Sequence, residues 1–351
     1  TAKHSEMAER ALQVARECGD KNLIAHALFE SGRAGVESGN IELTRKAREE
    51  LRRTIVQIDD DPPPIAYHAE AYCSYYLADI ASAAESAHRA VEALAKAGCI
   101  GELAAAYTGL GNCKLALARF EEARDAYRLA LGYSEKIGDD CRTSITYSNV
   151  GASHLIQGQV EQAILFGERS LAVGRQASAQ PALLRTWANL AFAYLLAGRR
   201  DDARVCFESI QGWIKDGRSW AINTEYYCES ASLELAFGNT VEALRLLSQA
   251  ERQCEGREHL FASQGMLGRL MVFLTYHNKG PRAAHQLALD GLERFKNRHL
   301  LAHLDAIAAL AWTEKTMTGL YSSTTENQLQ LFETYQAGGK RLILGMQGFL
   351  Y

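Results

Sequence analysis

The chain has 351 residues, of which 47% are hydrophobic and 23% are charged, and its formal net charge is −4. This composition is typical of a folded protein in water and excludes an intrinsically disordered chain. A weakly acidic chain offers no general attraction to nucleic acid or to an anionic membrane, and no stretch of 18 apolar residues could span a bilayer. We therefore expect no membrane partner, no direct nucleic-acid contact and a cytoplasmic location.

Catalytic and metal-binding motifs are absent from the sequence. The cysteines at positions 18, 73, 99, 113, 141, 206, 228 and 254 form no CxxC pair, so neither a zinc site nor a disulfide framework is expected. His299 and His303 lie one helical turn apart, but no third ligand accompanies them. Gly109 and Gly111 lack the third glycine of a dinucleotide-binding loop, and GxxxxGK, HExxH and GxSxG do not occur. We expect no catalytic residues, no cofactor and no metal.

Helical hairpins recur along the chain at a spacing of about 40 residues. In the clearest copy, residues 104–139, two amphipathic patterns of about 15 residues flank a short turn. Gly111 in its first helix and Ala123 in its second are small enough for the two helices to approach closely. The residues equivalent to Ala123, at steps of 39 to 41, are Thr44, Ala83, Ala123, Ala163, Ala203, Ala243, Ala284 and Thr324. The expected inter-helix turns, five residues earlier, are Gly39, Ala78, Ala118, Gly158, Gly198, Gly238, Lys279 and Gly319.

A hairpin of this kind leaves an apolar face that only the next hairpin can cover, so the sequence predicts an all-α solenoid. We expect one superhelical domain over residues 1–351 with eight repeats in residues 22–337. Residues 1–21 align with the second helix of a preceding repeat, and residues 338–351 begin a further element. Complete solenoids carry polar capping faces at their ends. This organisation therefore predicts a segment of a longer protein.

The repeat resembles a known family. Two copies carry it most clearly, the first with Tyr107, Leu110, Gly111, Ala118, Phe120, Ala123, Tyr127 and Ala130, and the second with Trp187, Leu190, Ala191, Tyr194, Gly198, Ala203 and Phe207. This pattern resembles the tetratricopeptide repeat. The resemblance implies a right-handed α-solenoid whose first helices line a concave groove. Repeats one, seven and eight depart most from the pattern, at Arg48, Trp312 and Gln328. Lengthened repeats whose second helix closes on Gly-Asp, as at Gly19 and Gly138, resemble the sensor domains of MalT-like transcription regulators of the LuxR family and signal-transducing ATPase class.

Candidate binding residues lie on the predicted inner face of the first helices. They are Arg33, His68, Tyr72, Tyr75, Asn112, Asn149, Arg185, Asn189, Arg269 and Tyr276. An aromatic stripe at helical spacing is more often core than ligand site. By resemblance, the asparagines either hold the backbone of a bound peptide or simply belong to the repeat consensus. Thr108 stands where a lysine that clamps a terminal carboxylate would be expected, which argues against that use.

Two functions fit these features. The first is a regulatory sensor domain of a transcription-regulating protein, whose groove binds a small effector or a protein and passes occupancy to other domains. The second is a scaffold that holds a peptide or a partner protein in the groove. A closed pocket between Tyr72 and Asn112 would favour a small effector, whereas an open row of asparagines would favour a peptide.

Overall fold

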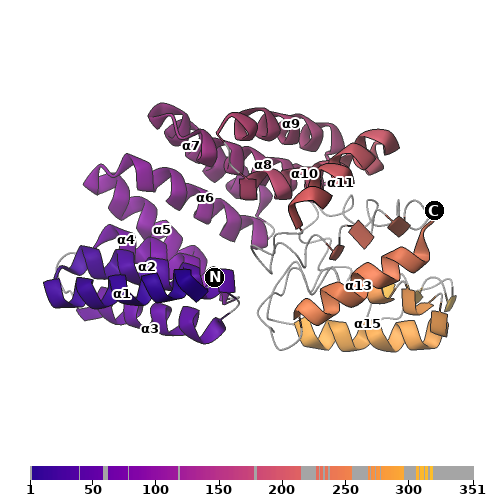
Figure 1. Ribbon diagram of the computed structural model, residues 1–351, viewed down its shortest axis with the longest axis horizontal. Coiled ribbons are helices and arrows are strands. Elements are labelled where there is room, and N and C mark those ends of the chain that lie inside the picture. Colours follow the sequence, from indigo (N-terminus) through magenta and orange to yellow (C-terminus); the bar gives the residue numbers. More distant parts are fainter. Residues whose placement is uncertain are drawn as a thin grey trace.

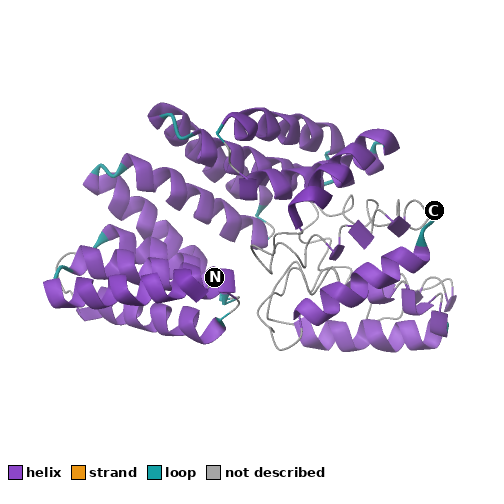
Figure 2. Ribbon diagram, viewed as in Figure 1, coloured by secondary structure: helices purple, strands orange, loops and turns teal. Residues whose placement is uncertain are grey.

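The computed structural model consists of helices joined by short turns (Figures 1 and 2). It describes residues 2–38, 40–57, 62–77, 79–117, 119–177, 180–214, 227–228, 230–231, 234–235, 238–254, 268, 270–272, 274–276, 278–295, 306–307, 309–311, 313–314 and 317–318. Helices and turns account for these residues, and none of them is in a strand. The predicted all-α fold class is confirmed.

Helix α1 (Ala2–Cys18) precedes five hairpins, each made of a first and a second helix. The first helices are α2 (Lys21–Ser38), α4 (Pro64–Tyr76), α6 (Ile100–Ala116), α8 (Asp140–Ile156) and α10 (Gln180–Leu196). The second helices are α3 (Ile41–Gln57), α5 (Ile80–Ala97), α7 (Phe120–Ile137), α9 (Val160–Gln176) and α11 (Arg200–Ile214). Farther along the chain, α13 (Thr240–Cys254) and α15 (Pro281–Phe295) occupy the predicted second-helix places of the next two repeats.

The hairpins stack in chain order. From α2 to α11, each helix packs against its hairpin partner, and each second helix also packs against the first helix of the following hairpin. Successive first helices contact one another directly, from α2 through α4, α6 and α8 to α10. In Figure 1 the hairpins follow an arch, with α7 and α9 on its outer side and α8 and α10 on the side toward α13 and α15. This stack is the predicted solenoid, and we call the side formed by the first helices the inner face.

The helix ends follow from local sequence. Asp79 and Asp139 cap α5 and α8, because their carboxylates accept hydrogen bonds from the backbone N–H of Ser82 (3.3 Å) and Arg142 (2.9 Å). Helix α7 ends at Gly138, whose left-handed backbone (φ 68°) closes the helix. Gly138 and Asp139 fix where the third hairpin ends and the fourth begins, whereas Asp79 marks the turn within the second hairpin.

Glycines make the turns within the later hairpins. The predicted turn residues Gly158, Gly198 and Gly238 have φ of 68°, 73° and 83°, a region that other residues adopt at a steric cost. In repeat seven the turn was expected at Lys279, but the left-handed residue is Gly280, one position later (φ 88°). The shift accompanies the one 41-residue step of the repeat. Gly39, Ala78, Ala118 and Gly319 lie outside the described residues.

Small residues bring the helices of each hairpin together, as predicted. Ala123 is fully buried, and so are Ala83, Ala203, Ala243 and Ala284 at the equivalent positions. A Cβ added to Gly111 would lie 2.4 Å from Cε1 of Tyr127. The Tyr127 ring therefore occupies the space that the missing side chain of Gly111 leaves open. Thr324, the last predicted marker, lies outside the described residues.

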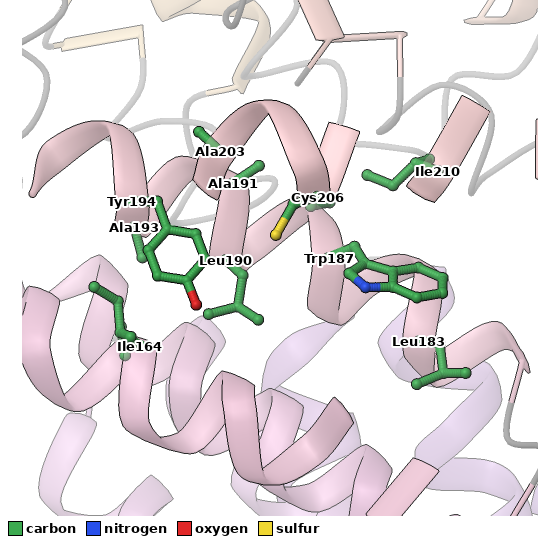
Figure 3. Close-up of a cluster of buried hydrophobic side chains, with 12 residues drawn as sticks. Ile164, Leu183, Trp187, Leu190, Ala191, Ala193, Tyr194, Ala203, Cys206 and Ile210 are labelled. Atoms are coloured by element: carbon green, nitrogen blue, oxygen red, sulfur yellow. The ribbon is translucent and has the colours of Figure 1, made fainter. Parts of the chain in front are cut away.

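Apolar side chains from neighbouring hairpins fill the core. Figure 3 shows Trp187, Leu190 and Tyr194 of α10 between Ile164 of α9 and Cys206 of α11, and all five side chains are at most 9% exposed. Burial of such side chains supplies about 1.5 to 3 kcal/mol each and is the main stabilising contribution. Helix α10 thus joins two repeats through a single continuous core.

Buried hydroxyl groups also join repeats four and five. The hydroxyl of Ser170 donates to the carbonyl of Ser144 (2.8 Å), and the hydroxyl of Ser144 donates to the carbonyl of Ser170 (2.9 Å). The hydroxyl of Thr186 lies 2.8 Å from that of Ser170. These contacts join α8, α9 and α10, and pairing is what makes buried hydroxyls tolerable in a core.

A buried carboxylate holds the first two hairpins together. Glu70 of α4 is 2% exposed, and its Oε1 accepts hydrogen bonds from Arg52 Nε (2.8 Å) and Ser74 Oγ (2.7 Å). The Arg52 guanidinium also lies 3.4 Å from the carboxylate of Asp79. Helices α3, α4 and α5 therefore share one ionic cluster.

Candidate binding face

Side chains of several first helices meet around one buried hydroxyl on the inner face. The hydroxyl of Tyr127 donates to Oδ1 of Asn112 (2.8 Å), and the side-chain amide of Asn149 donates to the same oxygen (3.1 Å). Tyr127 is fully buried, Asn149 is 8% exposed and Asn112 is half-buried. We call these three residues the asparagine–tyrosine network. It joins α6, α7 and α8 across the junction between repeats three and four.

Two further predicted residues act electrostatically on this network. Burial raises the pKa of Tyr127 well above its usual value, Tyr75 of α4 adds to the rise, and the guanidinium of Arg185 on α10 opposes it. Tyr75 is half-buried and Arg185 is exposed. Asn112 and Asn149, on α6 and α8, thus form the hydrogen-bonded contact, and Tyr75 of α4 and Arg185 of α10 influence the pKa of Tyr127.

Aromatic side chains form a second set of contacts, between α2 and α4. The rings of His68 and Tyr72 each meet the ring of Phe29 edge to face, with centroids 5.3 Å apart. Tyr76 packs on Tyr72 (4.7 Å) and on Tyr75 (5.4 Å). We call these five residues the aromatic cluster. Tyr75 also raises the pKa of Tyr127, so it links the aromatic cluster electrostatically to the asparagine–tyrosine network.

Burial dominates the titration of the aromatic cluster. The pKa of His68 falls to about 4, mainly because burial disfavours the charged imidazolium, and Arg142 lowers it further. His68 is therefore neutral near pH 7. Burial likewise raises the pKa of Tyr72 well above its usual value. The predicted site residue His68 is therefore a buried packing residue, and Tyr72 is half-buried.

Charged residues border the aromatic cluster. Arg33 of α2 pairs with Glu30 (3.1 Å) and Glu37 (3.6 Å), and His4 of α1 lies 2.8 Å from the Glu37 carboxylate. Glu37 raises the pKa of Tyr72, and Arg33 lowers it. The inner face thus carries carboxylates beside the aromatic cluster and the Arg185 guanidinium beside the asparagine–tyrosine network.

The remaining predicted residues are less closely tied to these contacts. Asn189 lies half-buried on α10. In the described part of the chain, the hydrogen bond between Asn112 and Asn149 does not extend to Asn189. Tyr276 is half-buried in a short helical segment. Arg269, His299 and His303 lie outside the residues whose side chains are described. Thr108, where a clamp lysine was considered, is buried and donates to the Ala104 carbonyl (2.8 Å).

The sequence analysis named Tyr127 only among the residues that carry the repeat resemblance and assigned it no role in the binding face. A usable signal was present, because a buried tyrosine needs a hydrogen-bond partner for its hydroxyl and Gly111 leaves room for its ring. Asn112 stands on the same helix as Gly111 and supplies that partner. The reach of one side chain between repeats cannot be read from spacing alone.

Within the described ranges, no group of three or more His, Cys, Asp or Glu residues is arranged to hold a metal ion. The helices that the structure describes include none with the length and apolarity needed to cross a membrane.

The comparisons with known proteins agree with this architecture. A family model described as tetratricopeptide repeat matches residues 102–176 and 142–210. Residues 102–210 therefore carry tetratricopeptide repeats. This region contains the asparagine–tyrosine network and Arg185. No curated protein sequence matches the chain.

Solved structures with the same fold include a complex with a peptide. The Rap conjugation gene regulator of plasmid pLS20, in complex with the Phr* peptide, superposes with a TM-score of 0.60 at 16% identity over 86% of this chain and 78% of its own. A Rap protein complexed with competence and sporulation factor gives 0.54 at 16% identity, over 86% and 77%. Aspartyl phosphate phosphatase F from Bacillus subtilis gives 0.57 at 16% identity, over 83% and 75%. At these identities the likeness concerns the fold, which is a tetratricopeptide-type solenoid.

Proposed function

We propose that this chain is a non-catalytic binding domain that holds an extended peptide segment of a partner along its inner face. The observation that carries the proposal is the hydrogen bond between Asn112 and Asn149 on consecutive first helices. Tyr75 and Arg185, on the first helices before and after them, act electrostatically on the Tyr127 hydroxyl that Asn112 accepts. The half-buried Asn112 and Tyr75 and the exposed Arg185 offer polar groups to a peptide backbone, which presents alternating donors and acceptors. The pairing of Asn112 with Asn149 fixes their amides before a ligand arrives, which lowers the entropic cost of binding.

A similar fold in complex with a peptide supports this reading. The pLS20 Rap regulator is in complex with the Phr* peptide, and another Rap protein is complexed with competence and sporulation factor. Their low identity to this chain transfers no residue roles. The peptide complex supports the proposal because a solenoid of this size accepts a peptide as its ligand.

A small effector is the second candidate, and the aromatic cluster favours it. Phe29, Tyr72 and Tyr76 present ring surface beside the Arg33, Glu30 and Glu37 charges, a combination suited to a compact ligand with an apolar and a polar end. In this form the domain is the sensor of a MalT-like transcription regulator. Ligand binding would then act by favouring one of two arrangements of the solenoid.

A paired selection separates the two candidates. A displayed library of random dodecapeptides is selected on the purified chain and counter-selected on the Asn112→Ala, Arg185→Glu double variant. In parallel, the chain is screened by thermal shift against metabolites and nucleotides, because a ligand of the folded state raises its melting temperature. Enrichment of related peptides that the double variant does not retain supports the peptide proposal. A saturable shift with a metabolite and no enriched peptide replaces it with the effector reading.

A further inference from the structure

Helix α6 presents bare backbone to the inner face at Gly109. By the repeat spacing, Gly109 takes the position of Asn149 in α8 and Asn189 in α10, two of the predicted binding residues. Gly109 is half-buried. Apart from the backbone of α6 itself, the one described atom within 4 Å of a Cβ built on Gly109 is Cε1 of His68, at 3.9 Å. The inner face therefore has room for another group at this point of the helix.

Packing within the fold does not explain this glycine. Glycine inside a helix is less stable than alanine. At Gly111, two residues later, glycine is required because a Cβ would lie 2.4 Å from the Tyr127 ring, and at Gly167 of α9 a Cβ would lie 2.6 Å from Leu190. Glycine also occurs where a ligand approaches the backbone closely. The open side of Gly109 is consistent with this second use.

The side chain that borders this space is a buried histidine without a hydrogen-bond partner among the described residues. His68 is 8% exposed, and the interactions described for it are the ring contact with Phe29 and the electrostatic effect of Arg142. Buried polar side chains nearly always have a partner. The neutral ring has one donor and one acceptor nitrogen, on either side of the Cε1 atom that faces Gly109. Hydrogen-bonding capacity therefore remains free at the edge of the open space.

Asn112 supplies a second polar group, one helical turn from Gly109. Both described hydrogen bonds of Asn112 use its Oδ1, which accepts from Tyr127 (2.8 Å) and Asn149 (3.1 Å). These bonds fix the orientation of the amide, whose N–H groups have no partner in the part of the chain that the structure describes. Since Asn112 is half-buried, a ligand on the inner face can reach these donors.

We propose that the Gly109 site, formed by the Gly109 backbone, the His68 ring edge and the Asn112 amide, holds a tyrosine side chain of the bound peptide. A flat ring can lie against a helix backbone only where no Cβ intervenes. The aromatic cluster, which includes His68, offers edge-to-face contacts to that ring. The tyrosine hydroxyl accepts from the Asn112 amide and donates to a ring nitrogen of His68. This inference rests on the proposed function and names the residue type that the inner face selects.

The dodecapeptide selection on the purified chain, followed by fluorescence anisotropy of the best peptide, tests the site. The peptide is titrated with the wild type, Gly109→Ala and Gly132→Ala. Gly132 is the matched control, because it is an exposed glycine of α7 whose added Cβ meets nothing within 4 Å. A second peptide, in which phenylalanine replaces the shared tyrosine, is titrated with the wild type and His68→Phe, a variant that keeps a ring beside Phe29. Melting temperatures show that each variant is folded.

The proposal predicts that the enriched peptides share a tyrosine. Gly109→Ala should weaken their affinity at least about tenfold while raising the melting temperature by about 1–3 °C, and Gly132→Ala should give the thermal gain alone. His68→Phe should weaken the tyrosine peptide at least about threefold and leave the phenylalanine peptide unchanged. Peptides without a shared tyrosine, or equal affinity for the wild type and Gly109→Ala, overturn this inference and leave the proposed function standing. Failure to enrich any peptide overturns both.

Discussion

The side-chain amide of Asn149 donates a hydrogen bond to the side-chain oxygen Oδ1 of Asn112 (3.1 Å), and the two residues belong to successive repeats. The same oxygen accepts the Tyr127 hydroxyl. The asparagines of the inner face therefore have a structural role besides any role in binding. A substitution there is expected to change stability and binding together, and the two effects have to be measured separately.

Asn112→Ala should lower the free energy of unfolding by about 1 to 3 kcal/mol, because it leaves the buried Tyr127 hydroxyl without its acceptor. Tyr127→Phe removes the hydroxyl and should cost about 1 kcal/mol or less. In the double variant the two costs should not add, since the unpaired group is gone. Urea unfolding of the wild type, both single variants and the double variant measures this coupling. Additive costs would show that the 2.8 Å contact contributes nothing.

Asn149→Ala should cost about 1 kcal/mol, because Asn112 keeps the Tyr127 hydroxyl as a donor. Asn189→Ala is the matched comparison, a half-buried asparagine of the next first helix. With the Asn112 contact known, we expect Asn149→Ala to destabilise more than Asn189→Ala. Equal melting temperatures would contradict this expectation.

Gly111→Ala should destabilise the third hairpin. The new Cβ would lie 2.4 Å from the Tyr127 ring, which is held by its hydrogen bond to Asn112 and cannot move freely. We expect a loss of about 1 to 3 kcal/mol in unfolding free energy. Gly132→Ala is the control, since its Cβ meets nothing within 4 Å and an alanine in a helix is stabilising by about 0.5 to 1 kcal/mol. A Gly111→Ala variant as stable as Gly132→Ala would refute the close approach.

Acidification should destabilise the fold through His68. Its pKa is about 4 in the folded chain against 6.5 as the ordinary value, so the unfolded chain binds the proton more tightly between these pH values. The stability is complete above pH 6.5 and is lost, by a few kcal/mol, as the pH falls through 4. His68→Gln should flatten this dependence, whereas His88→Gln, whose exposed side chain lies on α5, should not. Unfolding free energies from pH 7.5 to 4.5 give the comparison; identical slopes in all three proteins would exclude His68 as the cause.

Arg52→Ala should destabilise the junction of the first two hairpins, because it leaves the buried Glu70 carboxylate with Ser74 as its remaining described hydrogen-bond donor. We expect a loss of about 1 to 3 kcal/mol. Arg53→Ala, an exposed neighbour on the same helix, should change stability by less than about 0.5 kcal/mol. The melting temperatures of the two variants test this expectation, and equal values would mean that the ion pair between Arg52 and Glu70 does not stabilise the fold.

Spacing predicted the fold because each repeat depends on a few local features. Ala123 and its equivalents mark the close helix crossings, and Gly158 and Gly198 mark the turns, so their period reveals the stack directly. Among the described turns, the one at Lys279 was placed one residue too early. That error followed from assuming that every turn lies five residues before the small residue equivalent to Ala123. The predicted resemblance to tetratricopeptide repeats is confirmed for residues 102–210, whereas the organisation of the chain ends stays a prediction.

The candidate site was predictable only in part. Tyr75, Asn112, Asn149 and Arg185 were assigned to the inner face from helical phase. In the structure Asn112 and Asn149 meet through a hydrogen bond, and Tyr75 and Arg185 act electrostatically on Tyr127. That meeting depends on how far one repeat rotates relative to the next, which no local pattern encodes. The burial of His68 likewise depends on Phe29, a residue of the preceding hairpin.

The most direct test of the proposed function is fluorescence anisotropy of the best peptide from the dodecapeptide selection, titrated with the wild type and with Arg185→Ala and Tyr75→Phe. Arg128→Ala is the control, because its side chain is 78% exposed on the second helix α7. We expect saturable peptide binding, and Arg185→Ala should weaken the affinity at least about tenfold, or about 1.4 kcal/mol. Tyr75→Phe should also bind the peptide more weakly than the wild type, whereas Arg128→Ala should leave the affinity unchanged. Equal affinity for the wild type and the Arg185 variant, or an equal loss with Arg128→Ala, would contradict the claim that the inner face holds the peptide.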